Sequence, residues 1–367
     1  MTTRRLALAV QGRTEADAVR DPTGGTARRG YLFDDLFEKK YDESTLDTLP
    51  ANPSHRLIPA WARLAAEVHR RRNEYDVIVT WSERVSMTLM TLDRFLNGGK
   101  PHIAMLYWFS RPSMRAPLRA FGNRLHAIVT WSSVQRRYAI EELGLPAEKI
   151  YLIRHFVDQL FWSPRESRVD GISSAGAEMR DYPTLLDALR GTDIRCHIAT
   201  DHVRVDRFGF ARRMNAQGFA AAASSNVTIG RKPAGELREL YARSKFVVVP
   251  LQRSDTDNGV NVILEAMAMG KPVICSRTRG QVDVIQEGVT GIFVPVGDAD
   301  ALRAAILSLW NDPDRAATMG RAARAYVEKH HTLEAFCRDV KGAIDASLDG
   351  RTAAADGSLP GVFPTSA

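Results

Sequence analysis

The chain has 367 residues, of which 44% are hydrophobic and 25% charged, and its formal net charge is +7 at pH 7. This balance is that of a folded globular protein, so a mainly disordered chain is excluded; so is a membrane-spanning one, because no run approaches about 18–20 apolar residues. A chain of this length is too long for one compact core and suits two domains.

Apolar runs and amphipathic patterns alternate along most of the chain. In the first half, strands are expected at residues 6–10, 77–80, 102–106 and 127–130, with helices at 60–71 and 133–143. In the second half, strands are expected at 196–199, 227–229, 246–250, 272–275 and 291–294. The helices of that half are expected at 184–189, 235–244, 260–269, 300–310 and 313–330. Buried strands that each precede a helix predict parallel sheets covered by helices.

Two such series predict an α/β protein with two Rossmann-like domains that face a central cleft, where a ligand binds at the carboxyl ends of the strands. Pro164 interrupts a polar stretch between the two series. The predicted division is an N-terminal domain at 1–164, a C-terminal domain at 165–348 and a tail at 349–367. The tail is rich in Gly, Ala, Ser, Thr and Pro, a composition typical of disorder.

The chain lacks the short motifs of several cofactor and metal sites. No Gly-x-Gly-x-x-Gly follows a strand, and neither Gly-x-x-x-x-Gly-Lys-Ser/Thr nor His-Glu-x-x-His is present. The three cysteines do not form a Cys-x-x-Cys pair. These absences argue against nicotinamide chemistry, P-loop phosphoryl transfer and a structural zinc site, so no cofactor and no metal are expected.

The most informative stretch combines a strand, a polar loop and a helix. The apolar strand ends at Pro250, the loop Ser-Asp-Thr-Asp-Asn-Gly covers 254–259, and an apolar helix continues to Met269. The N-terminus of such a helix presents unpaired backbone N–H groups and a partial positive charge, which suit a phosphate. Gly259 lets a ligand approach the backbone closely.

Two acidic residues lie beside this predicted phosphate site. Asp257 is in the loop and Glu265 in the helix, with seven residues between them. Carboxylates repel phosphate, but they accept hydrogen bonds from the hydroxyls of a sugar or ribose. The alternative interpretation is that Asp257 caps the helix and Glu265 is an ordinary helical acid.

The motifs around these acids resemble a known family. Leu-Tyr-Ala-Arg-Ser at 240–244, Val-Pro at 249–250 and Asp-x7-Glu-Ala-Met-Ala-Met-Gly-Lys-Pro-Val at 257–273 are similar to the donor-binding core of GT-B glycosyltransferases of the large retaining family 4. Gly-Gln-Val-Asp-Val-Ile at 280–285 and Gly-Val-Thr-Gly at 288–291 match the family's next stretch. The resemblance covers roughly residues 76–340 and is strongest at 226–295.

The resemblance implies a retaining glycosyltransferase that moves a sugar from a nucleotide-diphosphate sugar to a hydroxyl, or similar nucleophile, of a small-molecule, lipid or saccharide acceptor. It implies that no metal is needed and that the nucleotide-sugar is a co-substrate, not a cofactor. The implied catalytic residues are Asp257, Glu265 and Arg180. The implied donor-binding residues are Gly230, Arg231, Lys232, Asn258, Gly259, Val260, Asn261 and Glu265. A helix N-terminus and an arginine stabilise the charge that develops on a departing diphosphate.

The chain departs from the family pattern near these residues. Asp257 stands where the family usually has Glu, and Gly259 follows it by two residues where three is usual. Ala177 replaces an Arg, which leaves Arg180 as one cation where two are common. These departures bear on the donor's identity more than on the fold.

In the first domain, aromatic and charged residues follow two predicted strands. Trp81 and Glu83 follow one strand, and Trp108 and Arg111 follow another, so all four are expected at the carboxyl edge of the sheet. We interpret them as acceptor contacts, together with His155 in the crossover between domains, because aromatic faces pack on rings and apolar chains. Packing at a domain interface is the alternative.

The excess positive charge lies in the first half, where residues 1–165 hold 25 Lys and Arg against 18 Asp and Glu. One interpretation is peripheral contact with an anionic membrane through a basic amphipathic stretch, although Pro117 argues against one continuous helix there. The other is a solvated basic face; no nucleic-acid partner is expected. The short apolar run at 6–10 predicts no export, so a cytoplasmic protein is expected, with the membrane contact on the cytoplasmic face. That basic stretch comprises Arg111, Arg115, Arg119 and Arg124, interleaved with Met114, Leu118 and Phe121.

Three alternatives to the main hypothesis stay open. Asp255-Thr256-Asp257 spells the Asp-x-Asp of metal-dependent GT-A glycosyltransferases. The same fold also supports other chemistry, such as a sugar epimerase or a pseudo-glycosyltransferase that forms a non-glycosidic link. A non-catalytic binding scaffold is the third alternative, favoured by the reduced set of cations and opposed by the intact pair of acids.

Overall fold

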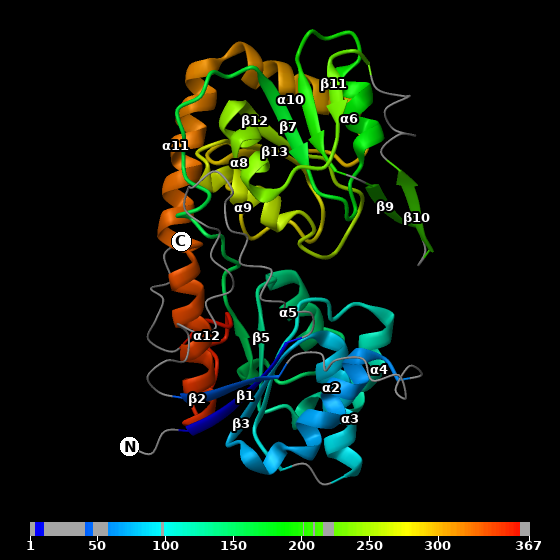
Figure 1. Ribbon diagram of the computed structural model, residues 1–367, viewed down its shortest axis with the longest axis vertical. Helices are drawn as coiled ribbons and strands as arrows, with labels where there is room; N and C mark the ends of the chain where they lie inside the picture. The colour runs from blue at the N-terminus through cyan, green and yellow to red at the C-terminus, as the bar shows by residue number, and fades with distance from the viewer. Residues whose placement is uncertain are drawn as a thin grey trace. The chain divides into compact units, whose positions relative to one another are not determined.

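The computed structural model describes residues 4–10, 41–46, 58–96, 99–200, 202–207, 210–215 and 224–359. The chain folds as two compact units (Figure 1). The first unit holds the described residues up to Arg154 and those from Glu334 onward, and the second holds His155–Leu333. The prediction of two α/β domains built on parallel sheets is therefore confirmed.

The first unit is built on a six-stranded sheet in which every neighbouring pair of strands is parallel. The strand order is β2-β1-β3-β4-β5-β6. Since the strands are parallel, their carboxyl ends meet at one edge and their amino ends at the other. The strands are β1 (Arg4–Val10), β2 (Tyr41–Leu46), β3 (Val77–Trp81), β4 (His102–Met105), β5 (Ala127–Thr130) and β6 (Ile150–Leu152).

Helices pack on the first sheet through apolar side chains at helical spacing. Val85 and Leu89 bury one stripe of α3 against β1 and β3, while Met114 and Leu118 of α4 enter the core around β4 and β5. The helix α4 continues through Pro117, contrary to the expectation of a break. The helices are α2 (Ala60–Arg70), α3 (Glu83–Phe95), α4 (Pro112–Phe121), α5 (Ser133–Glu141) and α12 (Leu333–Leu348), the last of which lies beside this sheet (Figure 1).

The second unit repeats the design with a parallel sheet in the order β11-β8-β7-β12-β13-β14. Its central strand β7 has the sequence Gly-Ile-Ser-Ser-Ala, fully buried, and sequence reasoning missed it because two serines hide its apolar character. The strands are β7 (Gly171–Ala175), β8 (Cys196–Ala199), β11 (Val227–Ile229), β12 (Ser244–Val249), β13 (Val273–Ser276) and β14 (Gly291–Val294). A separate antiparallel ribbon joins β9 (His202–Arg207) and β10 (Phe210–Asn215).

Two apolar cores flank the second sheet. One core joins the strands to α8, α9 and the second half of α11, and the other joins them to α6, α10 and the first half of α11. The helices are α6 (Tyr182–Leu189), α8 (Ala234–Arg243), α9 (Val260–Ala268), α10 (Ala299–Asn311) and α11 (Pro313–His330). The helix α9 is buried almost all round, since eight of its nine residues are buried.

The division between the units differs from the predicted one at both ends. It falls at Arg154 rather than at Pro164, and the chain from Glu334 rejoins the first unit. Residues 349–359 also pack there, contrary to the predicted disordered tail: the Tyr151 hydroxyl donates to the carbonyl of Arg351 (2.6 Å), and Leu359 is buried. Composition missed this because the segment is held mainly through its backbone. The rest of the predicted tail, 360–367, lies outside the described residues.

Among the helices that the structure describes, none combines the length and the apolar character needed to cross a membrane.

Candidate functional site

In the second unit, the loops at the carboxyl edge of the sheet converge on the N-terminus of α9. The loop after β7 is tied to the loop after β12, since the N–H of Asp181 donates to the carbonyl of Pro250 (3.0 Å) and the N–H of Gln252 to that of Met179 (2.9 Å). Parallel strands bring such loops together at one edge, which is where ligands bind in folds of this type. The convergence joins residues from two separate parts of the chain.

Arg180 lies in the loop after β7 and is only 3% exposed. Its Nε donates to the carbonyl of Ala175 (2.9 Å) and its Nη1 to that of Glu178 (2.8 Å), so the guanidinium is fixed. Gly176, at φ +94°, makes room for it, because a Cβ there would lie 2.5 Å from Nη2. Among the described residues no carboxylate forms an ion pair with Arg180. A buried cation without a counter-ion suits an anionic ligand.

Gly259 begins α9 in the left-handed conformation, with φ +91°. A Cβ at this position would lie 2.9 Å from Cγ1 of Val249 and 3.4 Å from Nη1 of Arg180. The guanidinium therefore lies directly beside the first turn of α9, as the resemblance implies. The N–H groups of that turn and the guanidinium of Arg180 are thus two adjacent sources of positive potential. We call the first turn of α9 together with Arg180 the α9 corner. Val260 is buried, whereas the side chain of Asn261 is exposed.

Hydrogen bonds lock the polar loop before α9. The Ser254 hydroxyl (2.6 Å) and the Thr256 hydroxyl (2.5 Å) both donate to Oδ1 of Asn258, so this side chain is engaged within the loop. Nε2 of Gln281 donates to the carbonyls of Asp257 and Asn258, at 3.0 Å each. Sequence reasoning did not assign Gln281 to the site. The shape of this loop thus depends on the buried amide of Gln281, which lies in the loop after the next strand, β13.

Asp257 has an unusual environment for a carboxylate. Its Oδ2 is buried and has no hydrogen-bond partner among the described residues. Burial raises its pKa from 3.8 to about 7, and the nearby charge of Asp283 adds to this effect. A carboxyl group that is already desolvated is suited to bond a sugar hydroxyl, and desolvated acids are typical of functional sites. No helix-capping hydrogen bond from its side chain is seen, which disfavours the capping alternative.

Glu265 lies on the second turn of α9 and is 9% exposed. The Tyr241 hydroxyl points to its Oε2 at 3.4 Å. Burial and the neighbouring Glu265 raise the pKa of Tyr241 well above its usual value, so the phenol stays a donor. Glu265 is therefore a positioned acceptor in the core of the second unit, which disfavours an ordinary solvent-facing helical acid.

The loop after β11 holds the predicted base-binding residues. Gly230 follows the edge strand, and its carbonyl lies 3.3 Å from Nε2 of His197. Arg231 is exposed, and Lys232 is paired with Glu236 at 3.1 Å. This loop and the α9 corner both lie at the carboxyl edge of the sheet. Because β11 is the outermost strand, the loop lies at one end of that edge.

In the first unit, three of the predicted acceptor residues form one cluster. Oε1 of Glu83 accepts the backbone N–H of Trp108 (2.8 Å), and its Oε2 lies 3.9 Å from Nη1 of Arg111. The Arg111 guanidinium lies 5.4 Å from the centre of the Trp108 ring. Burial raises the pKa of Glu83, which the N–H of Trp108 and the charge of Arg111 partly offset. Glu83 thus holds the β4 loop and is a positioning group.

An aromatic cluster lies beside these residues. Trp81 ends β3 and lies 6.2 Å from the ring of Trp131, which in turn stacks on Tyr107 at 5.8 Å and 13°. Phe336 of α12 contacts Trp81 at 5.8 Å. Trp131 follows β5 and escaped sequence reasoning, although its position after a buried strand is the same as that of Trp81. The carboxyl edge of the first sheet is therefore aromatic over three successive strands.

His155 belongs to the second unit, whereas the other predicted acceptor residues belong to the first. Its Nδ1 accepts the N–H of Phe156 (2.9 Å), and its carbonyl accepts Nδ1–H of His331 (2.6 Å). Burial lowers its pKa to about 4, so the ring is neutral. The structure thus ties His155 to the segment around His331, and a contact with an acceptor stays a prediction.

The predicted membrane-binding stretch of α4 is wrong in its apolar half. Met114 and Leu118 are buried in the first core, so they are the core face of an ordinary amphipathic helix. Arg115 and Arg119 are exposed on the other side. Helical periodicity is the same whether the apolar face meets a core or a bilayer, which is why the sequence could not separate the two.

Among the described residues, no group of three His, Cys, Asp or Glu side chains could hold a metal ion.

A family model, glycosyl transferases group 1, matches residues 222–326. A GDP-mannose-dependent phosphatidylinositol monomannoside mannosyltransferase of Mycolicibacterium smegmatis is 35% identical over 120 residues, which cover 32% of this chain and 30% of that protein. The D-rhamnosyltransferase WbpZ of Pseudomonas aeruginosa is 29% identical over 51% of this chain and 46% of its own length. The aligned region thus spans less than half of either relative.

Solved structures match nearly the whole chain. Sucrose-phosphate synthase from Thermosynechococcus elongatus has a TM-score of 0.71 at 17% identity, over 95% of this chain and 99% of that one. HepE from Anabaena, in complex with UDP and glucose, has a TM-score of 0.67 at 17% identity, over 94% and 100%. At this identity the match concerns the fold alone. Residues 222–326 are therefore similar to glycosyl transferases group 1, and the two parallel-sheet units have the fold of GT-B glycosyltransferases.

Proposed function

We propose that this protein is a retaining, metal-independent glycosyltransferase that takes a sugar from a nucleoside diphosphate sugar. One observation carries the proposal: the buried guanidinium of Arg180, without an acidic partner among the described residues, lies beside the first turn of α9, with Asp257 and Glu265 on the adjoining loop and helix. The first pair suits a diphosphate and the second suits sugar hydroxyls.

In this proposal, each residue has one role in breaking the bond between the sugar and the diphosphate. Negative charge grows on the departing diphosphate, and Arg180 with the N–H groups of α9 stabilises it without a metal. Asp257 accepts a hydrogen bond from the donor sugar, and Glu265 accepts from the ribose. The loop Gly230–Lys232 faces the nucleobase. The preformed cation replaces the divalent ion that other glycosyltransferases use.

The nucleotides that similar proteins bind or use support a nucleoside diphosphate sugar as the donor. The HepE structures hold UDP and UDP-glucose, and the mycobacterial relative is GDP-mannose-dependent. We therefore propose a UDP-sugar or a GDP-sugar as donor. The acceptor, a small molecule, a lipid or a saccharide, is proposed to bind the carboxyl edge of the first sheet, around Trp81, Trp108 and Arg111.

The test is nucleotide binding followed by turnover. Thermal shifts with UDP, GDP, ADP and dTDP, each with EDTA or Mg²⁺, should give a metal-independent shift with UDP or GDP, since saturation at 100 times Kd adds about 2.7 kcal/mol. Asp257→Ala and Glu265→Ala should each lower turnover at least about 100-fold in a folded protein. Wild-type turnover in both variants, or a shift that requires Mg²⁺, would contradict the proposal. An inverted anomeric product would contradict retention.

A further inference from the structure

The amino edge of the first sheet carries the most exposed apolar side chains of the described residues. Phe95, at the end of α3, is 68% exposed, and the next residue, Leu96, is 54% exposed. The ring of Phe95 makes an edge contact with the ring of Phe121, with 6.0 Å between the ring centres, and the Arg94 guanidinium lies 5.7 Å from the centre of the Phe95 ring. Two adjacent large apolar side chains held in water mark a surface that contacts something apolar.

Basic side chains frame these two residues. Arg94 and Arg124 are exposed, and Arg124 follows Phe121 by three residues. We call Arg94, Phe95, Leu96, Phe121 and Arg124 the α3-end patch. A protein partner with an apolar surface would not require these cations, whereas an anionic bilayer offers both an apolar interior and a negative face.

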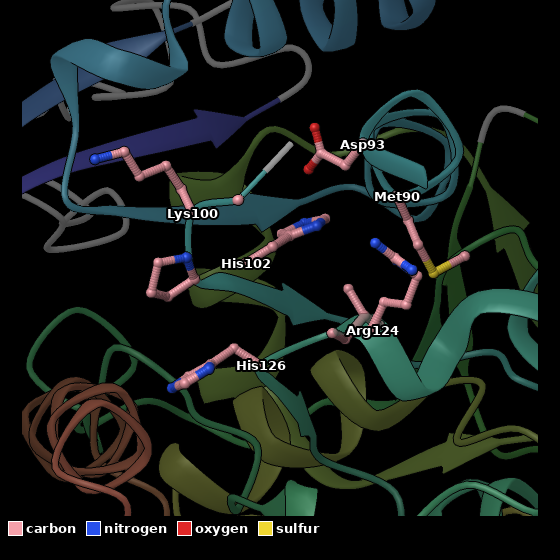
Figure 2. Close-up of a pocket in the computed structure, with 9 residues that line it drawn as sticks. Met90, Asp93, Lys100, His102, Arg124 and His126 are labelled. Carbon is pink, nitrogen blue, oxygen red and sulfur yellow. The ribbon is translucent and has the colours of Figure 1, made fainter. Parts of the chain in front are cut away.

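A hollow of about 300 Å³ opens beside the α3-end patch (Figure 2). It lies where β4 and β5 begin, and Arg124 belongs to both features. Figure 2 shows Met90 and Asp93 on the wall formed by α3, with Lys100 and His126 on the opposite side of His102 in this view.

The charge of this hollow favours an anion. Lys100, Arg124 and His126 line it, and Asp93 is the acidic side chain in its wall. Asp93 is already engaged, since its Oδ1 lies 2.7 Å from Nδ1 of His69. The floor adds no charge: His102 is buried, and burial lowers its pKa to about 4. The two cations of this lining, Lys100 and Arg124, therefore suit a phosphate group in charge.

We propose that the α3-end patch and its hollow dock the protein on an anionic lipid surface. Phe95 and Leu96 enter the boundary between headgroups and acyl chains, while Arg94, Arg124 and Lys100 meet lipid phosphates. This assignment keeps Phe121 and Arg124 of the stretch expected from the sequence and leaves out Met114 and Leu118, which are buried. It is independent of the proposed glycosyl transfer, because it uses the opposite edge of the sheet.

Vesicle co-sedimentation of the full chain tests the assignment. Wild type should bind vesicles of phosphatidylcholine with about 30% phosphatidylglycerol, should not bind phosphatidylcholine alone, and should weaken as salt is raised. The double variant Phe95→Ser/Leu96→Ser and the double variant Arg94→Gln/Arg124→Gln should each lower the partition coefficient at least about 10-fold.

Control variants alter exposed residues of the second unit. Val289→Ser removes an apolar side chain that is 52% exposed, and Arg190→Gln removes an exposed cation; both should bind as wild type does. Unchanged melting temperatures show that each variant is folded.

Three results would overturn the proposal: no binding to anionic vesicles, equal binding to neutral ones, or equal losses in the controls. A fourth would reassign the hollow to a soluble anion, namely a thermal shift with inorganic phosphate that Arg124→Gln abolishes while vesicle binding is absent.

Discussion

The carboxyl edges of the two sheets have the same architecture and different chemistry. In the second unit the edge is ionic, with Arg180 fixed by backbone carbonyls beside the first turn of α9. In the first unit it is aromatic, with Trp81, Tyr107 and Trp131 in contact after three successive strands. A parallel sheet decides where loops gather, but the residues in those loops decide what they bind.

The two edges also differ in how they are fixed. In the second unit, backbone carbonyls and glycines hold the side chains, so the ligand-binding groups are preorganised by the loop itself. In the first unit, one buried carboxylate, Glu83, holds the N–H of Trp108 while the rings pack on each other. We therefore expect changes in the second unit to affect chemistry and changes in the first to affect acceptor affinity.

The largest expected effect is that of Arg180→Gln. Removing the cation that faces the departing diphosphate should lower turnover by about 100- to 1000-fold, the usual loss when one preorganised stabilising group is removed. Arg180→Lys retains the charge but not the fixed fork and should recover part of the rate. Steady-state kinetics with melting curves give both answers. The control is Arg190→Gln, an exposed arginine paired with Asp187 in the same unit, and an equal loss there would refute the role.

Gly259→Ala should have the next largest effect. Both the left-handed backbone (φ +91°) and the contact at 2.9 Å with Val249 oppose a Cβ, so we expect a loss of about 2–3 kcal/mol in unfolding free energy and weaker nucleotide binding. Gly288→Ala is the control, because its φ is +75° but nothing lies within 4 Å. Denaturant unfolding of both compares strain alone with strain plus contact. Equal losses would mean that the α9 corner is not tightly packed.

Asp257→Asn should have a smaller effect, and it should raise the stability of the folded protein where Gly259→Ala lowers it. In the folded protein the pKa of Asp257 is raised from 3.8 to about 7, so the folded state binds the proton more tightly. The cost of ionising it therefore grows as pH rises from about 4 and is complete above about 7. The variant should be more stable than wild type by at least about 1 kcal/mol at pH 8, or about 2–4 °C in Tm, and less so at pH 5. Parallel pH dependences of the two melting temperatures would contradict the burial of this acid.

The smallest expected effect lies in the first unit. Trp131→Ala should raise the acceptor KM by about 3- to 10-fold through lost stacking, with kcat and the nucleotide Kd nearly unchanged. Trp61→Ala is the control, a partly buried tryptophan of α2 that packs on the core of the same unit. Kinetics with any acceptor that supports turnover would separate them. A loss in nucleotide affinity with an unchanged acceptor KM would remove the contrast between the two edges.

Sequence reasoning predicted the fold where apolar character and periodicity coincide. The strands β5, β8, β11 and β14 and the helix α11 have the predicted bounds. It missed β7 because Ser173 and Ser174 look polar, although Ser173 is satisfied by Ser244 at 2.8 Å inside the sheet. It also missed α12, whose return to the first unit is a long-range contact that no local pattern encodes.

The same contrast holds for the candidate sites. Around α9, the spacing of Asp257, Gly259 and Glu265 is local and could be read from the sequence, whereas Arg180 lies on another loop and was assigned through the resemblance alone. Gln281 was missed, since its bonds to the carbonyls of Asp257 and Asn258 depend on the approach of two loops. That approach also needs Gly280, where a Cβ would lie 2.1 Å from the carbonyl oxygen of Thr256.

Calorimetric titration of UDP and GDP in EDTA, into wild type and Arg180→Gln, tests the central claim most directly. We expect one of these nucleotides to bind wild type at one site without a metal, and to bind the variant at least about 10-fold more weakly. Binding that appears only with Mg²⁺, or equal affinity in both proteins, would contradict a diphosphate site built from a buried arginine and the first turn of α9.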